Sequence, residues 1–159
     1  MAGDLKLKYG TANQAITCTI TSLTNGSYRQ STVVDNGTNL FTDVLVTVKA
    51  KANSAGTSST GKVQIYAYGT ADGSSYDGGA SGTDGSYSIP TGGSINLTLL
   101  GTLNIDANSK VDQQTFSLAQ AFGGAVPTKW GIVVLNSTGA TLDASVGSAW
   151  YQGVLAQYT

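Results

Sequence analysis

The sequence contains no histidine and no glutamate, and it has only one cysteine, one arginine and two prolines. Without histidine or glutamate the chain cannot form a Ser-His-Asp triad, an H-E-x-x-H zinc helix, a paired-glutamate glycosidase site or an EF-hand with its closing glutamate. These exclusions remove most of the familiar kinds of enzyme active site. We therefore expect a protein that is not an enzyme and that needs no metal or cofactor.

Charge is also scarce, because charged residues make up 11% of the chain and the net charge is −1. The lysines are dispersed, so no surface field would concentrate a nucleic acid or an anionic membrane. No apolar run approaches the roughly 18 residues of a membrane span, and the start of the chain lacks a signal-peptide core. We expect no nucleic-acid partner, no membrane partner and a protein that is made in a cytosol.

The single cysteine, Cys18, excludes an intrachain disulfide. It lies at two-residue spacing from Ile16 and Ile20, which predicts a small buried hydrophobe with no redox role. The polar surface must come mainly from 17 serines, 21 threonines and 21 glycines. This composition is typical of a β-rich binding or structural domain.

Apolar residues alternate with polar ones along most of the chain, which is the period of a β-strand. Nine segments show this pattern or a continuous apolar run: 5–9, 15–20, 28–34, 41–51, 62–68, 94–103, 115–118, 130–135 and 148–158. Gly-rich turns separate them, and residues 113–122, the one helix-like stretch, read equally well as a strand. The pattern predicts an all-β protein, an antiparallel β-sandwich of jelly-roll or Greek-key type with eight or nine short strands.

We divide the chain into an N-terminal arm or edge strand at 1–13 and a single sandwich domain at 14–159. Apolar and basic residues alternate in the arm, which favours either an edge strand of the same sandwich or a strand added to a neighbour's sheet, with the lysines against an acidic face. The candidate interface residues of this segment are Leu5, Lys6, Leu7, Lys8 and Tyr9.

Four tyrosines flank a long loop predicted at 71–93, and they are candidate interface residues as well: Tyr66, Tyr68, Tyr76 and Tyr87. Exposed tyrosines can stack on sugar rings or fill a protein interface. The alternative is a half-buried face packed under the loop. The loop also carries Asp72, Asp77 and Asp84, whose spacing favours turn formation over a calcium site.

Trp130 and Trp150 lie in the two most apolar segments, and we expect both in the core. Arg29 follows Tyr28 and precedes Asp35 by six residues. An arginine in such a place predicts a fixed pair with a carboxylate, or a stacked contact, that holds a loop.

Five phrases together resemble small virion structural proteins of tailed bacteriophages: YRQS at 28–31, VDNGTNLF at 34–41, VQIYAYGTADG at 63–73, AFGGAVPTKWGIVV at 121–134 and AWYQGV at 149–154. The resemblance implies a β-sandwich subunit displayed on the capsid as a decoration or cement protein, or less often built into a tail or fibre. It implies the major capsid protein and copies of the chain itself as partners, with a trimer favoured, and a location in the virion after assembly in the bacterial host cytoplasm. A carbohydrate-binding module that uses the four tyrosines remains the alternative.

Overall fold

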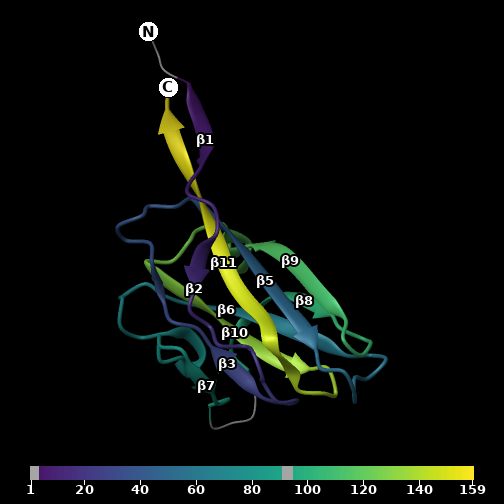
Figure 1. Ribbon diagram of the computed structural model, residues 1–159. Helices are drawn as coiled ribbons and strands as arrows, with labels where there is room; N and C mark the ends of the chain where they lie inside the picture. Colours follow the sequence, from purple (N-terminus) through teal and green to yellow (C-terminus); the bar gives the residue numbers. More distant parts are fainter. Residues whose placement is uncertain (1–3, 91–94) are drawn as a thin grey trace.

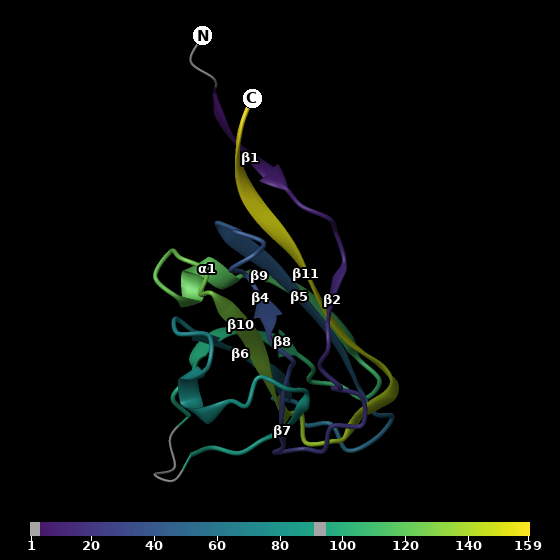
Figure 2. The same cartoon turned by 90° about the vertical axis from the view of Figure 1, so that its left-hand side faces the viewer.

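The computed structural model describes residues 4–90 and 95–159, which form two antiparallel sheets packed face to face (Figures 1 and 2). Three predicted segments extend into residues outside this description, namely the arm at 1–13, the loop at 71–93 and the strand at 94–103. The predicted all-β antiparallel sandwich is confirmed.

The first sheet has the strand order β1-β11-β5-β9, with β2 also paired to β11. Its strands are β1 (Leu5–Tyr9), β2 (Gln14–Ile16), β5 (Asp43–Ala52), β9 (Val111–Ser117) and β11 (Leu142–Tyr158). The second sheet has the order β7-β3-β10-β6-β8, with β4 also paired to β10. Its strands are β3 (Tyr28–Gln30), β4 (Val34–Asp35), β6 (Lys62–Thr70), β7 (Gly85–Tyr87), β8 (Thr98–Asn104) and β10 (Lys129–Ser137).

The described residues form eleven strands rather than the expected eight or nine. The segment at 28–34 divides into β3 and the start of β4, and at the division the Oγ of Ser31 accepts the hydrogen bond from the backbone N–H of Ile132. A further strand, β7, lies within the segment predicted as loop. One strand is also far from short, since β11 has 17 residues.

The central strand β10 is buried on both faces, as its continuous apolar run predicts. Trp130, Ile132 and Val134 face the core between the two sheets. Val133 and Leu135 face the other way, into a second apolar cluster on the outside of the same sheet. The second sheet is therefore packed from both sides, which leaves the first sheet with the more open outer face.

The stretch 113–122 forms both of the structures that its sequence allows. β9 ends at Ser117, whose side chain accepts a hydrogen bond from the backbone of Gln120 and so caps the short helix α1 (Leu118–Ala121). The carboxylate of Asp43, the first residue of β5, accepts hydrogen bonds from Ser117 Oγ at 2.8 Å and from the backbone N–H of Ala119 at 2.9 Å. This carboxylate therefore fixes the helix against the sheet.

We predict that Ile132→Ala lowers the free energy of unfolding by about 2–5 kcal/mol, because it removes buried methyl groups and leaves a cavity. Ile132 is 0% exposed in the core, whereas Leu40 is 71% exposed and serves as the control position. Leu40→Ala is expected to change stability by less than about 0.5 kcal/mol. Urea denaturation measures both, and equal losses would contradict the assignment of the core.

Candidate functional site

β1 and the last residues of β11 form a two-stranded antiparallel ribbon that projects from the sandwich (Figures 1 and 2). Leu5 pairs with Tyr158 at the tip, and Tyr9 pairs with Val154 at the base. The neighbouring strand β5 makes its last pair with β11 at Val154, so residues 155–158 pair with β1 alone. β1 is thus an edge strand of its own chain that lies outside the body of the sandwich.

The ribbon has one apolar and one basic face, because side chains alternate along each strand. The register places six apolar or aromatic residues on the first face: Leu5, Leu7, Tyr9, Val154, Ala156 and Tyr158. Four of these are large and strongly exposed, at 63% for Leu5, 70% for Leu7, 60% for Tyr9 and 75% for Tyr158. The opposite face carries Lys6, Lys8, Leu155 and Gln157.

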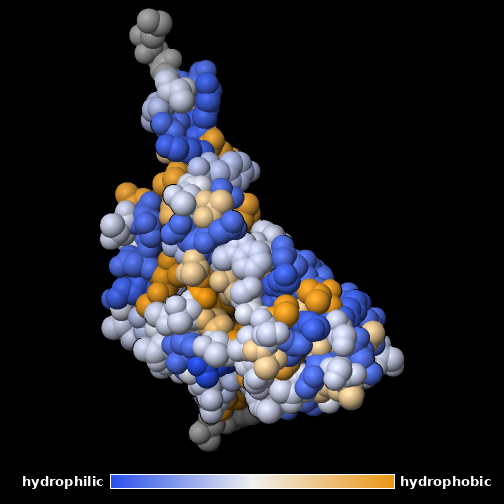
Figure 3. Space-filling model, viewed as in Figure 1, coloured by the Kyte–Doolittle hydropathy of each residue, from blue (hydrophilic) through white to orange (hydrophobic). Residues whose placement is uncertain are grey.

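Both edges of the ribbon are anchored at its base. The backbone N–H of Gly10 donates to the carbonyl of Gly153 at 2.8 Å, and the backbone N–H of Thr42 donates to the carbonyl of Val154 at 2.8 Å. The ring of Phe41 packs so closely on Gly153 that a Cβ at this glycine would lie 2.2 Å from the ring. The ribbon therefore leaves the body in a defined direction, and Figure 3 shows it standing clear, with a largely hydrophilic face toward the viewer.

The prediction that Trp130 packs in the core is confirmed, but the same prediction for Trp150 is wrong. Tyr151 pairs with the core residue Val46, and its ring meets Trp130 edge to face at a centroid distance of 5.3 Å. Trp150 pairs with Thr47 on the opposite, outer face and is half-buried there. This segment is apolar on both sides, so its pattern did not decide which side faces the core.

The strand β11 also contributes side chains to the outer face of the first sheet. Trp150 lies on the same side of β11 as Ala156 and Tyr158, since all three positions are even-numbered in an unbroken register. Trp150 borders a groove of about 260 Å³, which Leu45 and Thr47 also line. Between Trp150 and Ala156 this side of β11 carries the polar Gln152 and the buried Val154, so the exposed apolar face of the ribbon ends at its base.

Three of the four candidate tyrosines belong to the second apolar cluster, and Tyr76, in the segment that follows β6, packs against it. Tyr66 is 9% exposed, Tyr68 0% and Tyr87 5%, while Tyr76 is half-buried. The hydroxyl of Tyr68 donates to the carbonyl of Ser31 at 2.6 Å, and burial raises its pKa to about 12. The structure thus places these residues as the half-buried alternative describes, and their contact with any partner stays a prediction.

A bidentate ion pair fixes the covering segment to the sheet. Arg29 Nε donates to Asp84 Oδ1 and its Nη2 donates to Asp84 Oδ2, both at 2.7 Å. An arginine pair that holds a loop was expected, but the partner is not Asp35, whose carboxylate accepts from the backbone N–H of Gly37 in its own turn. Arg29 on β3 pairs with Ser86 on β7, which brings Asp84 within reach across the two strands.

The other carboxylates of the loop accept hydrogen bonds from the backbone. Asp72 accepts from the backbone N–H groups of Ser74 and Ser75, which hold its pKa below the usual range, and Asp77 accepts from that of Gly69. Within residues 4–90 and 95–159, no three His, Cys, Asp or Glu side chains are grouped to hold a metal ion. The predicted burial of Cys18 is confirmed, and that burial raises the pKa of its thiol to about 12.

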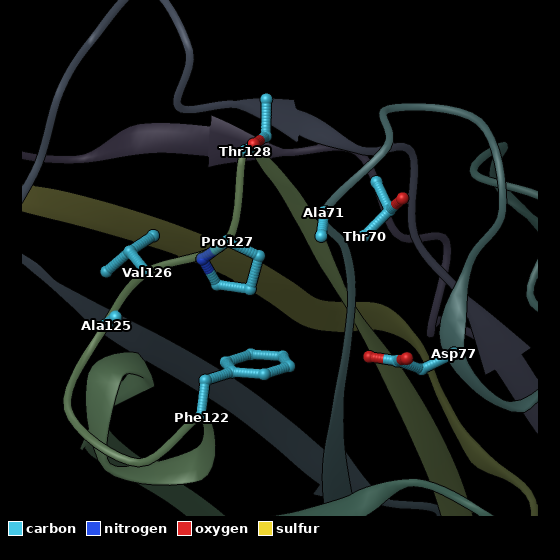
Figure 4. Close-up of a pocket in the computed structure, with 8 residues that line it drawn as sticks. All are labelled: Thr70, Ala71, Asp77, Phe122, Ala125, Val126, Pro127 and Thr128. Atoms are coloured by element: carbon cyan, nitrogen blue, oxygen red, sulfur yellow. The ribbon is translucent and has the colours of Figure 1, made fainter.

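A separate open cavity of about 400 Å³ lies where the chain after α1 approaches the end of β6 (Figure 4). Phe122 and Pro127 form one wall, and the carboxylate of Asp77 points toward the space from the other side. The lining also includes Thr128 and Thr70, and the Thr70 hydroxyl donates to Asp72 and accepts from the backbone N–H of Gly73. The cavity thus combines an aromatic ring with hydrogen-bonding groups.

Sequence reasoning found the β1 half of the ribbon and missed the contribution of β11. The alternation at 148–158 continues through Ala156 to Tyr158, past the point where a strand of ordinary length would end. That excess length, together with a matching alternation at 5–9, was the available signal. The sequence alone did not show that the two segments pair.

No protein-family model matches this chain, and no curated protein sequence is significantly similar to it. In the part of the chain that the structure describes, no helix is long and apolar enough to cross a membrane.

We predict that Asp84→Asn lowers the free energy of unfolding at pH 7 by about 1.5–3 kcal/mol, the range for hydrogen bonds to charged groups. Hydrogen bonds from Arg29 lower the pKa of Asp84 from 3.8 to about 2 in the folded protein. Its stabilisation is therefore complete above pH 3.8 and is lost as the pH falls through about 2.

Denaturant titrations of wild type and variant between pH 7 and pH 2 test this. Asp106→Asn is the control, because Asp106 forms an exposed pair with Lys110 that we expect to contribute little. A difference between wild type and Asp84→Asn that stays constant over the whole pH range would contradict the assigned role of the pair.

Proposed function

We propose that this protein is a non-enzymatic structural subunit of a tailed-bacteriophage particle, and that it decorates or cements the capsid surface. The observation that carries the proposal is the projecting ribbon of β1 and β11, with its exposed apolar face. The particle itself is implied by the resemblance of five sequence phrases to small phage virion proteins. A place in the tail or a fibre would use the same ribbon.

The ribbon is suited to assembly because its strand edges and apolar side chains remain free to contact another protein. A two-stranded ribbon is at best marginally stable in water without further packing. Exposed strand edges and large apolar side chains both gain free energy when another protein covers them. The ribbon therefore supplies contact surface rather than chemistry, which is what a subunit of a particle needs.

The basic face gives the ribbon a preference for one kind of particle surface. Lys6 and Lys8 project from the same side of β1 and are exposed. An acidic patch on the major capsid protein would attract this side, and a symmetric lattice would multiply each weak contact. A surface rich in serine and threonine adds hydrogen bonds at a small cost in side-chain entropy.

We predict that deletion of residues 2–12 reduces binding to the particle far more than it reduces the melting temperature of the isolated protein. The deletion removes β1, whose side chains are exposed throughout and contribute little to the core. Co-sedimentation with particles of the phage that encodes the chain measures binding, and circular dichroism measures melting.

Lys6→Ser/Lys8→Ser is the matched variant that keeps the ribbon but removes its charge, and it is expected to weaken particle binding in a salt-dependent way. Lost stability with retained particle binding would assign β1 to the sandwich alone. Mass spectrometry of purified particles supplies a further check, because a structural subunit must be present in many copies per particle.

A second candidate function, carbohydrate binding, is favoured by the cavity at Phe122. Protein sites for sugars combine an apolar platform with a few hydrogen-bonding groups, and this cavity pairs the Phe122 ring with Asp77 and Thr128. The four tyrosines are less suited to stack on a sugar, because their own chain covers most of their surface.

For this second function we predict that Phe122→Leu weakens glycan binding at least about tenfold, because leucine keeps apolar volume but lacks the aromatic face. A glycan array identifies the ligand, and titration calorimetry with that glycan compares the variants. Phe41→Leu, which changes a ring at the ribbon base, is the control. Equal affinity for wild type and Phe122→Leu, or no array signal, would exclude a sugar site in this cavity.

A further inference from the structure

We propose that a second copy of this chain covers the apolar face of the ribbon, so that two ribbons pack face to face with their lysines turned outward. This inference rests on the proposed function, because it names a partner for the ribbon that the proposed function uses. Self-association and particle binding are nevertheless separate properties. The oligomer would present two sets of lysines to a capsid surface.

The apolar face of the ribbon has the amino-acid composition that is typical of the core of a protein interface. Tyr9 and Tyr158 are 60% and 75% exposed, and Leu5 and Leu7 are exposed beside them. Interface cores are enriched in aromatic residues and depleted of charge. None of the six residues that the register places on this face is charged.

The positions of the lysines favour packing through the face over pairing through the edge. If two β1 strands paired antiparallel about Leu7, Lys6 of one copy would lie opposite Lys8 of the other. Like charges in directly opposed positions are destabilising, and lysines on edge strands are a common protection against such pairing. Face-to-face packing leaves all four lysines in solvent.

The apolar face is also complementary to itself in shape. In two parallel ribbons related by a twofold axis along their length, β1 of one copy lies over β11 of the other. Leu7 pairs with Ala156 within each ribbon. The axis therefore places Leu7 of each copy over Ala156 of the other, a large side chain over a small one.

The size and charge of the face indicate the strength of association. A fully buried tyrosine covers about 150–250 Å². Tyr9 and Tyr158 still expose 60% and 75% of their surface, and the leucines and Ala156 add to this. The sum reaches several hundred Å² per copy, which is typical of weak to moderate association. A net charge of −1 per chain imposes little long-range repulsion between copies. We therefore expect association at micromolar concentrations.

Light scattering coupled to size-exclusion chromatography, at about 1–200 µM protein, tests the inference. Wild type is expected to exceed the 16.2 kDa monomer mass as concentration rises. Leu5→Ser/Leu7→Ser should remain monomeric, while Lys6→Ser/Lys8→Ser, on the other face of the same strand, should associate at least as well as wild type. Ala156→Trp fills the space under Leu7 and should weaken association at least about tenfold, which edge pairing would not predict.

The melting curves of these variants must match that of the wild-type monomer. A match shows that the substitutions reduce association without unfolding the protein. A wild type that stays monomeric at 200 µM, or a Leu5→Ser/Leu7→Ser variant that still associates, overturns the inference. Co-sedimentation with particles tests the proposed function separately: association without particle binding refutes the particle assignment alone, and particle binding by a monomer refutes the self-association alone.

Discussion

The backbone pairing of β11 is the interaction on which the rest of the molecule depends. One edge of this strand pairs with β2 and then with β1, while the other edge pairs with β5 as far as Val154. The same strand therefore completes the first sheet and forms half of the ribbon. Because a continuous strand carries the twist of its sheet outward, the sandwich sets the direction in which the ribbon points.

Aspartate side chains hold many of the turns and loops in place. This explains how a chain with so few charged residues keeps a defined structure. Most of the nine aspartates accept a hydrogen bond from a backbone N–H, as Asp43, Asp72 and Asp143 do. Asp84 combines this role with the pair to Arg29. Such carboxylates fix turns and short helices locally.

The fold class could be predicted from the sequence because two-residue alternation specifies strands directly, and a run that is apolar on both faces marked β10 as central. The orientation of β11 could not be predicted, because both of its faces are apolar. Only the register with β5 places Tyr151 inside and Trp150 outside. The interface tyrosines show the same limit. The two-residue spacing of Tyr66 and Tyr68 places both on one face of β6, but the covering of that face depends on Arg29 reaching Asp84 across 55 positions.

The pairing of β1 with β11 also has a consequence for how the protein is made. Residues 5–9 have no partner until residues 154–158 have left the ribosome, so the ribbon forms after the rest of the first sheet has been synthesised. Pairings this distant in sequence are slow to form and come late in folding. A chain interrupted before β11 would lack the ribbon altogether, and with it any contact that the ribbon makes.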